Sequence, residues 1–131
     1  MAFKARLQFS GKEYDVLQAD YSFNRDVDSK GRPSSSVYGG TINIEVESTE
    51  DSSVVEAMVN NQYKPISGIL LIKKSDEDAK MKEIIFEDGY IIQYEEGINI
   101  VGAHAMTYKF SISARSITIG NATNEQDWPK A

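Results

Sequence analysis

A regular alternation of apolar and polar residues constrains the fold more than any other feature of the chain. Between Thr41 and Glu47, the apolar residues Ile42, Ile44 and Val46 each stand between two polar residues. Successive side chains of a β-strand point to opposite faces of its sheet, so a period of two is typical of a strand with one buried face. Similar alternation predicts strands at residues 3–9, 14–23 and 106–119.

Other apolar segments predict strands at residues 66–74 and 82–94. One helix is predicted within residues 49–63, where an apolar stripe beginning at Val54 has helical spacing and Ser53-x-x-Glu56 matches a capping box. No β–α–β alternation is present. We therefore expect a mainly β fold, an antiparallel two-sheet β-barrel or sandwich with one flanking α-helix.

Two details concern single strands. On its strand, Leu17 is expected to share one face with Ala19, Tyr21 and Phe23. The adjacent glycines Gly39 and Gly40 predict a β-bulge or a close approach of another backbone.

The chain has the size of one domain, covering residues 1–131, with a polar loop at 24–36 and a polar tail at 120–131. With 14 Lys and Arg against 20 Asp and Glu, its formal net charge of -6 opposes binding to nucleic acid or anionic lipid. No apolar run has the length of a signal peptide or a membrane span, and there are no cysteines. We expect a cytoplasmic chain without nucleic-acid partners or membrane insertion.

Residues suited to catalysis are sparse. The only histidine, His104, lies in a predicted loop, and the Gly-x-Ser-x-Gly nucleophile motif is absent. The acidic clusters Asp76–Asp78 and Glu95-Glu96 could hold a cation or share a proton, but they are interpreted as solvated turns with flanking lysines at 73, 74, 80 and 82. The sequence thus predicts no enzyme and no cofactor, with a hydrolase using His104 kept as an alternative.

The loop at 24–36 contains the start of a calcium-loop pattern, Asn24-x-Asp26-x-Asp28. Such a loop needs glycine at its sixth position and a bidentate glutamate at its twelfth, where this chain has Ser29 and Ser35. We therefore expect no metal site. Polar connections of this length in a compact domain are uncommon and often bind a partner, so we interpret the loop as a contact surface.

Several segments together resemble one known family. They are the runs at 21–28, 31–35, 37–48, 73–74 and 76–83, and the ending Glu125-x-x-Trp128-Pro129-Lys130. In these segments the chain is similar to the tube protein of type VI secretion systems, the Hcp (TssD) family, in its subtype iii branch. The resemblance implies a barrel subunit of homo-hexameric rings that stack into a hollow tube. A contracting sheath drives this tube out of the cell with its spike and effector proteins, so the subunit starts in the cytoplasm and is secreted.

Two hypotheses about residues follow from this resemblance. The charged residues of the loop are expected to reach the neighbouring ring: Arg25, Asp26, Asp28, Lys30 and Arg32. One of two polar strand faces is expected to line the lumen, either Thr41, Asn43, Glu45 and Glu47 or Lys109, Ser111, Ser113 and Arg115. The alternatives are a merely flexible loop and a monomeric β-barrel that binds a peptide or small ligand.

Overall fold

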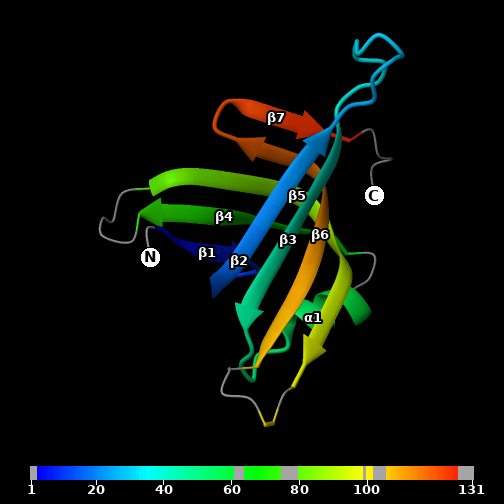
Figure 1. Ribbon diagram of the computed structural model, residues 1–131. Helices are drawn as coiled ribbons and strands as arrows, with labels where there is room; N and C mark the ends of the chain where they lie inside the picture. Colours follow the sequence, from blue (N-terminus) through cyan, green and yellow to red (C-terminus); the bar gives the residue numbers. More distant parts are fainter. Residues whose placement is uncertain (1–2, 61–63, 75–79, 99, 102–105, 127–131) are drawn as a thin grey trace.

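The computed structural model describes residues 3–60, 64–74, 80–98, 100–101 and 106–126 (Figure 1). Its elements are β1 (Phe3–Phe9), β2 (Lys12–Asn24), β3 (Tyr38–Glu47), α1 (Ser53–Val59), β4 (Ile66–Lys74), β5 (Lys80–Gly97), β6 (Thr107–Ile119) and β7 (Ala122–Glu125). His104, Trp128 and the cluster Asp76–Asp78 lie outside the described residues. The described part of the chain contains no helix able to span a membrane.

Six antiparallel strands form a barrel in the order β3-β2-β1-β4-β5-β6, and β6 pairs with β3 to close it. In Figure 1, β2, β3, β6 and the second half of β5 run together, while β1, β4 and the first half of β5 cross them. The strands β5 and β6, of 18 and 13 residues, are long enough to take part in both layers. The predicted mainly β barrel with one helix is confirmed. The short strand β7 pairs with the end of β6, within the segment 120–131 that the sequence predicts only as a polar tail.

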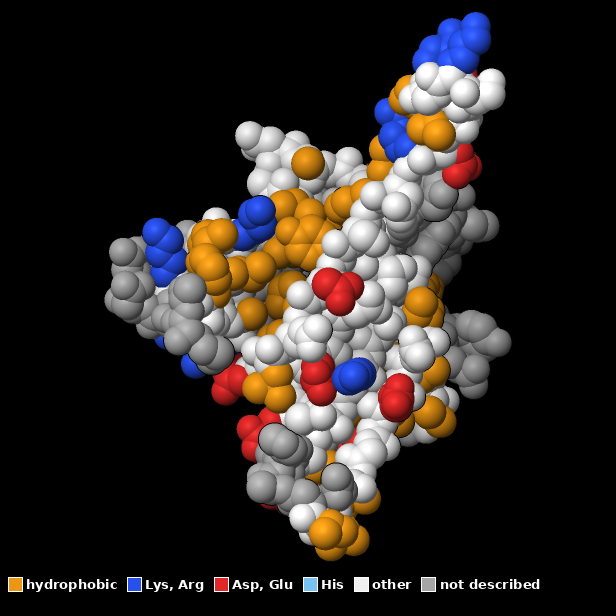
Figure 2. Space-filling view, in the orientation of Figure 1, with side chains coloured by type: hydrophobic (Ala, Val, Ile, Leu, Met, Phe, Trp, Pro, Cys, Tyr) orange, Lys and Arg blue, Asp and Glu red, His pale blue; other side chains and the backbone are white. Residues whose placement is uncertain are grey.

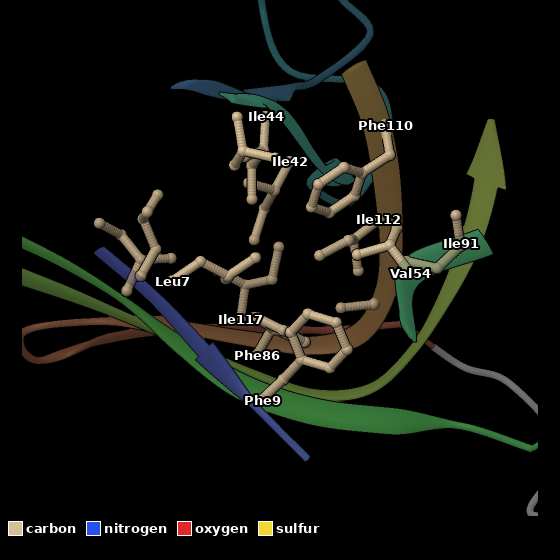
Figure 3. Close-up of a cluster of buried hydrophobic side chains, with 14 of the residues drawn as sticks. Leu7, Phe9, Ile42, Ile44, Val54, Phe86, Ile91, Phe110, Ile112 and Ile117 are labelled. Carbon is tan, nitrogen blue, oxygen red and sulfur yellow. The ribbon is translucent and has the colours of Figure 1, made fainter. Parts of the chain in front are cut away.

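The core fills the space between the two layers, and Figure 3 shows its side chains converging from β1, β3, β5, β6 and α1. Leu7, Phe86 and Ile112 have no exposed surface. At Gly68 the packing leaves no room for a side chain, because a Cβ atom there would lie 2.2 Å from the carbonyl oxygen of Gln8. Glycine at this position therefore lets β4 lie close against β1, with which it is paired.

The predicted orientation of Leu17 is wrong. The register passes from Val16 opposite Val46 to Gln18 opposite Glu45, so Leu17 is an extra residue in β2 and its side chain is 57% exposed. A β-bulge of this kind reverses which side chains of a strand face the core. Before Leu17 the even-numbered residues of β2 face the core, and after it the odd-numbered residues do.

The predicted bulge at the paired glycines is confirmed. Ser22 lies opposite Thr41, but Phe23 lies opposite Gly39, so Gly40 is the additional residue in β3. Its φ of 76° is in the left-handed region that favours glycine.

The helix α1 lies within the predicted range 49–63, but the predicted capping box is wrong. Ser52 occupies the N-cap position and makes no side-chain capping bond. Ser53 instead donates from Oγ to Oδ1 of Asp51 at 2.8 Å. Val54 anchors the helix, since it is only 1% exposed.

Candidate assembly surfaces

The connection between β2 and β3, residues 25–37, forms an arm that projects from one end of the barrel (Figure 1). Val27 and Pro33 form an antiparallel bridge across it. The amide of Asp28 donates to the carbonyl of Arg32 at 2.8 Å, and the amide of Ser34 donates to the carbonyl of Asp26 at 2.8 Å. These bonds continue the antiparallel pairing of β2 and β3 beyond the barrel and give the arm a defined conformation.

Asp28 organises the tip of the arm. Its Oδ1 accepts hydrogen bonds from the amides of Lys30 at 2.9 Å and Arg32 at 3.0 Å, and its Oδ2 accepts one from Nε of Arg32 at 3.0 Å. The bonds from Arg32 and Lys30 to the carboxylate lower the pKa of Asp28. Gly31, with a φ of 86°, completes the turn. The Asp28 carboxylate therefore makes its hydrogen bonds within the arm and stabilises the turn at its tip.

The remaining predicted contact residues of the arm have different surroundings. Arg25 donates from Nε to the carbonyl of Ser35 at 3.2 Å, and the backbone amide of Asp26 donates to Oγ of Ser35 at 2.8 Å. Lys30 is exposed, and the Arg32 side chain is 74% exposed in spite of its ion pair. Figure 2 shows basic side chains gathered at the far end of the arm. The tip thus presents positive charge to solvent.

The two strand faces predicted as alternative lumen linings are in fact one surface. Register places Thr41 opposite Ser113, Asn43 opposite Ser111 and Glu45 opposite Lys109 on the outer face of β3 and β6. Residues of β2 and β5 extend this surface, which we call the polar wall. A shallow depression of about 270 Å³ at its centre is lined mainly by Gln18, Asp20, Asn43, Glu45, Gln93, Glu95, Lys109 and Ser111.

Hydrogen bonds link the strands across the polar wall. Oγ of Ser111 donates to Oδ1 of Asn43 at 2.6 Å, and Nδ2 of Asn43 donates to Oδ1 of Asp20 at 2.8 Å. Lys109 lies opposite Glu45 on one side and Glu95 on the other. The wall is therefore polar and mixed in charge along its whole width.

Two of the predicted lining residues lie at the ends of this surface. Arg115 contacts Asp88 of β5 at 2.7 Å and lies 3.9 Å from both Glu87 and Glu125, so it ties β5, β6 and β7 together. Glu47 lies at the opposite end, where β3 leaves the barrel.

Glu47 takes part in a second depression, of about 620 Å³, which we call the acidic depression. It lies where β2 begins and β3 ends, and its lining is Lys12, Glu13, Tyr14, Asp15, Val46, Glu47, Thr49 and Asp51. Apart from Glu47, the sequence does not predict it, because its residues come from two distant stretches, 12–15 and 46–51, that the pairing of β2 with β3 brings together.

Asp51 is the centre of a hydrogen-bond cluster in this depression. It accepts bonds from Nζ of Lys12 at 2.6 Å and from the hydroxyl of Tyr14 at 2.8 Å. The bond from Lys12 is the main cause that lowers the pKa of Asp51 to about 2, while burial and the bond to Asp51 raise the pKa of Tyr14. The cluster fastens the start of β2 to the connection that precedes α1.

In the described residues, no group of three or more His, Asp or Glu side chains is arranged to hold a metal ion. The polar wall and the depressions offer contact surfaces made of carboxylates, amides and hydroxyls, which suit interactions between proteins.

Comparisons with known proteins agree with this architecture. A family model described as Hemolysin coregulated protein Hcp (TssD) matches residues 1–129. No curated protein matches the chain in sequence.

Hcp1 from Flavobacterium johnsoniae is 35% identical, with a TM-score of 0.87 over 94% of this chain and 99% of that one. Hcp1 from Salmonella typhimurium shares the fold at 14% identity, with a TM-score of 0.74 over 95% of this chain and 92% of that one. The sheath-tube complex of an extracellular contractile injection system, PVC, contains a chain with the same fold at 8% identity, with a TM-score of 0.59 over 88% and 87%. The chain therefore belongs to the Hcp (TssD) family, and it is a structural tube subunit of a type VI secretion system and not an enzyme.

Proposed function

We propose that this subunit forms hexameric rings that stack into a hollow tube, with the polar wall facing the lumen and the arm contacting the next ring. The observation that carries this proposal is the pairing pattern of the four strands that form the polar wall. At each lateral edge of the wall, one strand has a neighbour on only one side: β2 at one edge and β5 at the other.

The first of these edges is the second half of β2. This strand pairs with β1 only from Lys12 to Val16, and from Gln18 to Asn24 it pairs with β3 alone. The other edge is the second half of β5, which pairs with β4 as far as Gly89 and from Tyr90 to Gly97 pairs with β6 alone. Because the two edges differ, the β2 edge of one copy can bind the β5 edge of the next in a heterologous contact. Repeating this contact forms a closed ring when the rotations between neighbouring copies add up to a full turn.

Joining β2 of one subunit to β5 of its neighbour makes the polar wall continuous around the ring. Main-chain hydrogen bonds at such an edge supply affinity, as they do when a strand is added to a sheet. The hydroxyls, amides and charges of the wall then line the lumen. A hydrated surface of mixed charge suits the transient holding of effector proteins that must later be released.

Lateral joining of strands also sets the direction of the tube. Strands that pair side by side around a ring run largely along its axis, so the arm at one end of β2 and β3 points toward the next ring. In this arrangement the assembled tube waits in the cytoplasm inside the sheath, below the spike, and leaves the cell on contraction. The family is secreted by the type VI system.

The purified protein tests the ring directly. Mass photometry and negative-stain images are expected to show particles of six subunits with a central hole. A protein that stays monomeric at high concentration would contradict the proposal and favour the alternative of a monomeric barrel that binds a peptide or small ligand in the depression of the polar wall.

The arm is tested by deletion. Replacing residues 26–32 by a short glycine linker is expected to leave rings intact but prevent their stacking, as measured by sedimentation and electron microscopy. Stacking that equals that of the parent protein under the same conditions would contradict the role of the arm.

Effector retention tests the lumen. Substituting the polar wall at Asn43 and Ser111 is expected to change how much effector is recovered with secreted tubes, while ring formation is unchanged. A matched substitution at Lys82, which is exposed on the first half of β5, is expected to leave recovery unchanged.

A further inference from the structure

We propose that the basic tip of the arm docks into the acidic depression of the copy in the next ring. This inference rests on the proposed stacking of rings and names the surface that receives the arm.

The donor and the acceptor lie at opposite ends of the same pair of strands. The arm joins the end of β2 to the start of β3, and the acidic depression is built where β2 begins and β3 ends. Figure 1 shows the arm at the far end of this ribbon from the connection that leads to α1. A strand of 13 residues spans roughly 40 Å at the usual rise per residue. Translation of one copy along its strands therefore brings an arm to a depression.

The tip carries positive charge that its own structure does not neutralise. Asp28 is saturated by bonds from the backbone and from Arg32. The ammonium group of Lys30 has no hydrogen-bond or ion-pair partner among the described residues. Arg32 uses its Nε in the bond to Asp28, which leaves the other guanidinium nitrogens to solvent.

The depression carries a negative balance. Its lining contains the carboxylates of Glu13, Asp15, Glu47 and Asp51 and the single ammonium group of Lys12.

The cations around the depression are already engaged. Lys12 is bound to Asp51 at 2.6 Å, while Arg6 is shared between Glu13 at 3.4 Å and Asp15 at 3.5 Å. Glu47 is exposed and its carboxylate has no partner within the described part of the chain. A lysine or arginine from another copy can therefore form an ion pair with the Glu47 carboxylate.

The arm of one ring binds the acidic depression of the next, so the contact is head-to-tail and can be repeated indefinitely along the tube. Each ring presents arms on one face and depressions on the other, so stacking continues in one direction. Exposed ion pairs are individually weak and are screened by salt. Several copies of the contact acting together between two rings make the interface cooperative while each contact remains separable.

A charge exchange tests the docking. Lys30→Glu and Glu47→Lys alone are each expected to raise the ring concentration needed for stacking by roughly tenfold or more, because a few-fold effect per contact is multiplied over the ring. The double variant Lys30→Glu, Glu47→Lys is expected to regain most of the lost stacking. Neither side chain has a described partner within the subunit, so the fold should be unaffected.

The matched control is the double variant Lys30→Glu, Glu95→Lys. It has the same net charge as Lys30→Glu, Glu47→Lys, but its lysine lies on the polar wall instead of in the acidic depression. No recovery is expected from this pair. Equal recovery in both double variants would overturn the docking and indicate a general charge effect, and no recovery in either would also contradict it. In every variant, ring formation is measured first by mass photometry, so a failure of the ring itself is recognised separately.

Cross-linking supplies a second measurement. The chain has no cysteine, so Ser29→Cys at the tip and Thr49→Cys in the depression introduce a unique pair. Oxidation of stacked rings is expected to give disulfide-linked ladders only when both cysteines are present, because a disulfide requires Cα atoms within about 7 Å. Absence of ladders in samples that electron microscopy shows to be stacked would overturn the docking.

Discussion

The barrel and the arm belong to one chain but are stabilised by different interactions. The barrel is organised by buried apolar side chains such as Phe86 and Ile112, and the arm by backbone hydrogen bonds and by bonds to the half-buried carboxylate of Asp28. Burial of apolar surface is little affected by charge screening or modest changes in pH, whereas exposed polar contacts respond to both. In the proposed tube, this difference separates the barrel, which stays folded during ejection, from the arm, which makes and releases contacts between rings.

The largest effect is expected where the barrel has no space. Gly68→Ala places a Cβ atom 2.2 Å from the backbone of β1 and 2.8 Å from Phe86. We expect the free energy of unfolding to fall by more than about 5 kcal/mol, which leaves much of the chain unfolded. Urea unfolding followed by circular dichroism measures this loss. Gly97→Ala is the control, because nothing lies within 4 Å of its Cβ position, and a similar loss there would contradict the packing argument.

Removal of a core side chain should have the next largest effect. Phe86→Ala is expected to lower the free energy of unfolding by about 3–5 kcal/mol through the cavity it creates. The same unfolding experiment on Phe3→Ala, whose side chain is 47% exposed, should show less than about 1 kcal/mol. Comparable losses at the two positions would mean that burial in the barrel does not determine its stability.

An intermediate effect is expected at Asp51, which joins the barrel to the start of α1 through polar contacts. Asp51→Asn is expected to lower the free energy of unfolding by about 1–3 kcal/mol at pH 7, since an amide cannot accept all the bonds that the carboxylate does. Glu50→Gln, an exposed neighbour, is the control.

The pH dependence of this effect follows from the lowered pKa of Asp51. The pKa is about 2 in the folded chain against an ordinary 3.8, so the contribution is complete above about pH 4 and is lost as the pH falls toward 2. The difference between Asp51→Asn and the parent protein should therefore shrink over this range in urea unfolding measured at several pH values. A difference that stays constant down to pH 2 would exclude ionisation of Asp51 as its source.

The smallest effect on stability is expected at Asp28. Asp28→Asn should change the free energy of unfolding by less than about 0.5 kcal/mol, because the arm lies outside the core. It should nevertheless speed hydrogen exchange at the amides of Lys30 and Arg32, which donate to this carboxylate. Ser29→Ala is the matched control at the same tip. A large loss of barrel stability would show that the arm and the barrel are not independent.

The sequence predicts the barrel better than the surfaces between subunits. Alternation of apolar and polar residues locates four of the six barrel strands, as in Ile42, Ile44 and Val46. Other apolar segments locate the remaining two, β4 and β5. The bulge at Leu17 escapes this reasoning, since an inserted residue leaves an uninterrupted apolar pattern. The pair Gly39 and Gly40 marks the other bulge, because only glycine readily adopts the required φ.

Of the candidate surfaces, the arm can be recognised from the sequence and the acidic depression cannot. The charged arm is recognisable from its length and composition, but the role of Asp28 within the turn appears only when hydrogen bonds are known. The acidic depression combines Lys12 with Glu47 and Asp51, which lie more than 30 residues further along the chain. No local pattern encodes such a set, since tertiary pairing alone brings its members together.

The short strand β7 has a consequence for the choice of neighbours during assembly. Where β6 leaves β3, its backbone would be open to any passing strand, and exposed strand edges invite indiscriminate association. Residues Ser116 to Ile119 are instead paired with β7, and Arg115 secures this cover through Glu125. The pairing with β7 thereby keeps the end of β6 from adding to a strand of an unproductive partner.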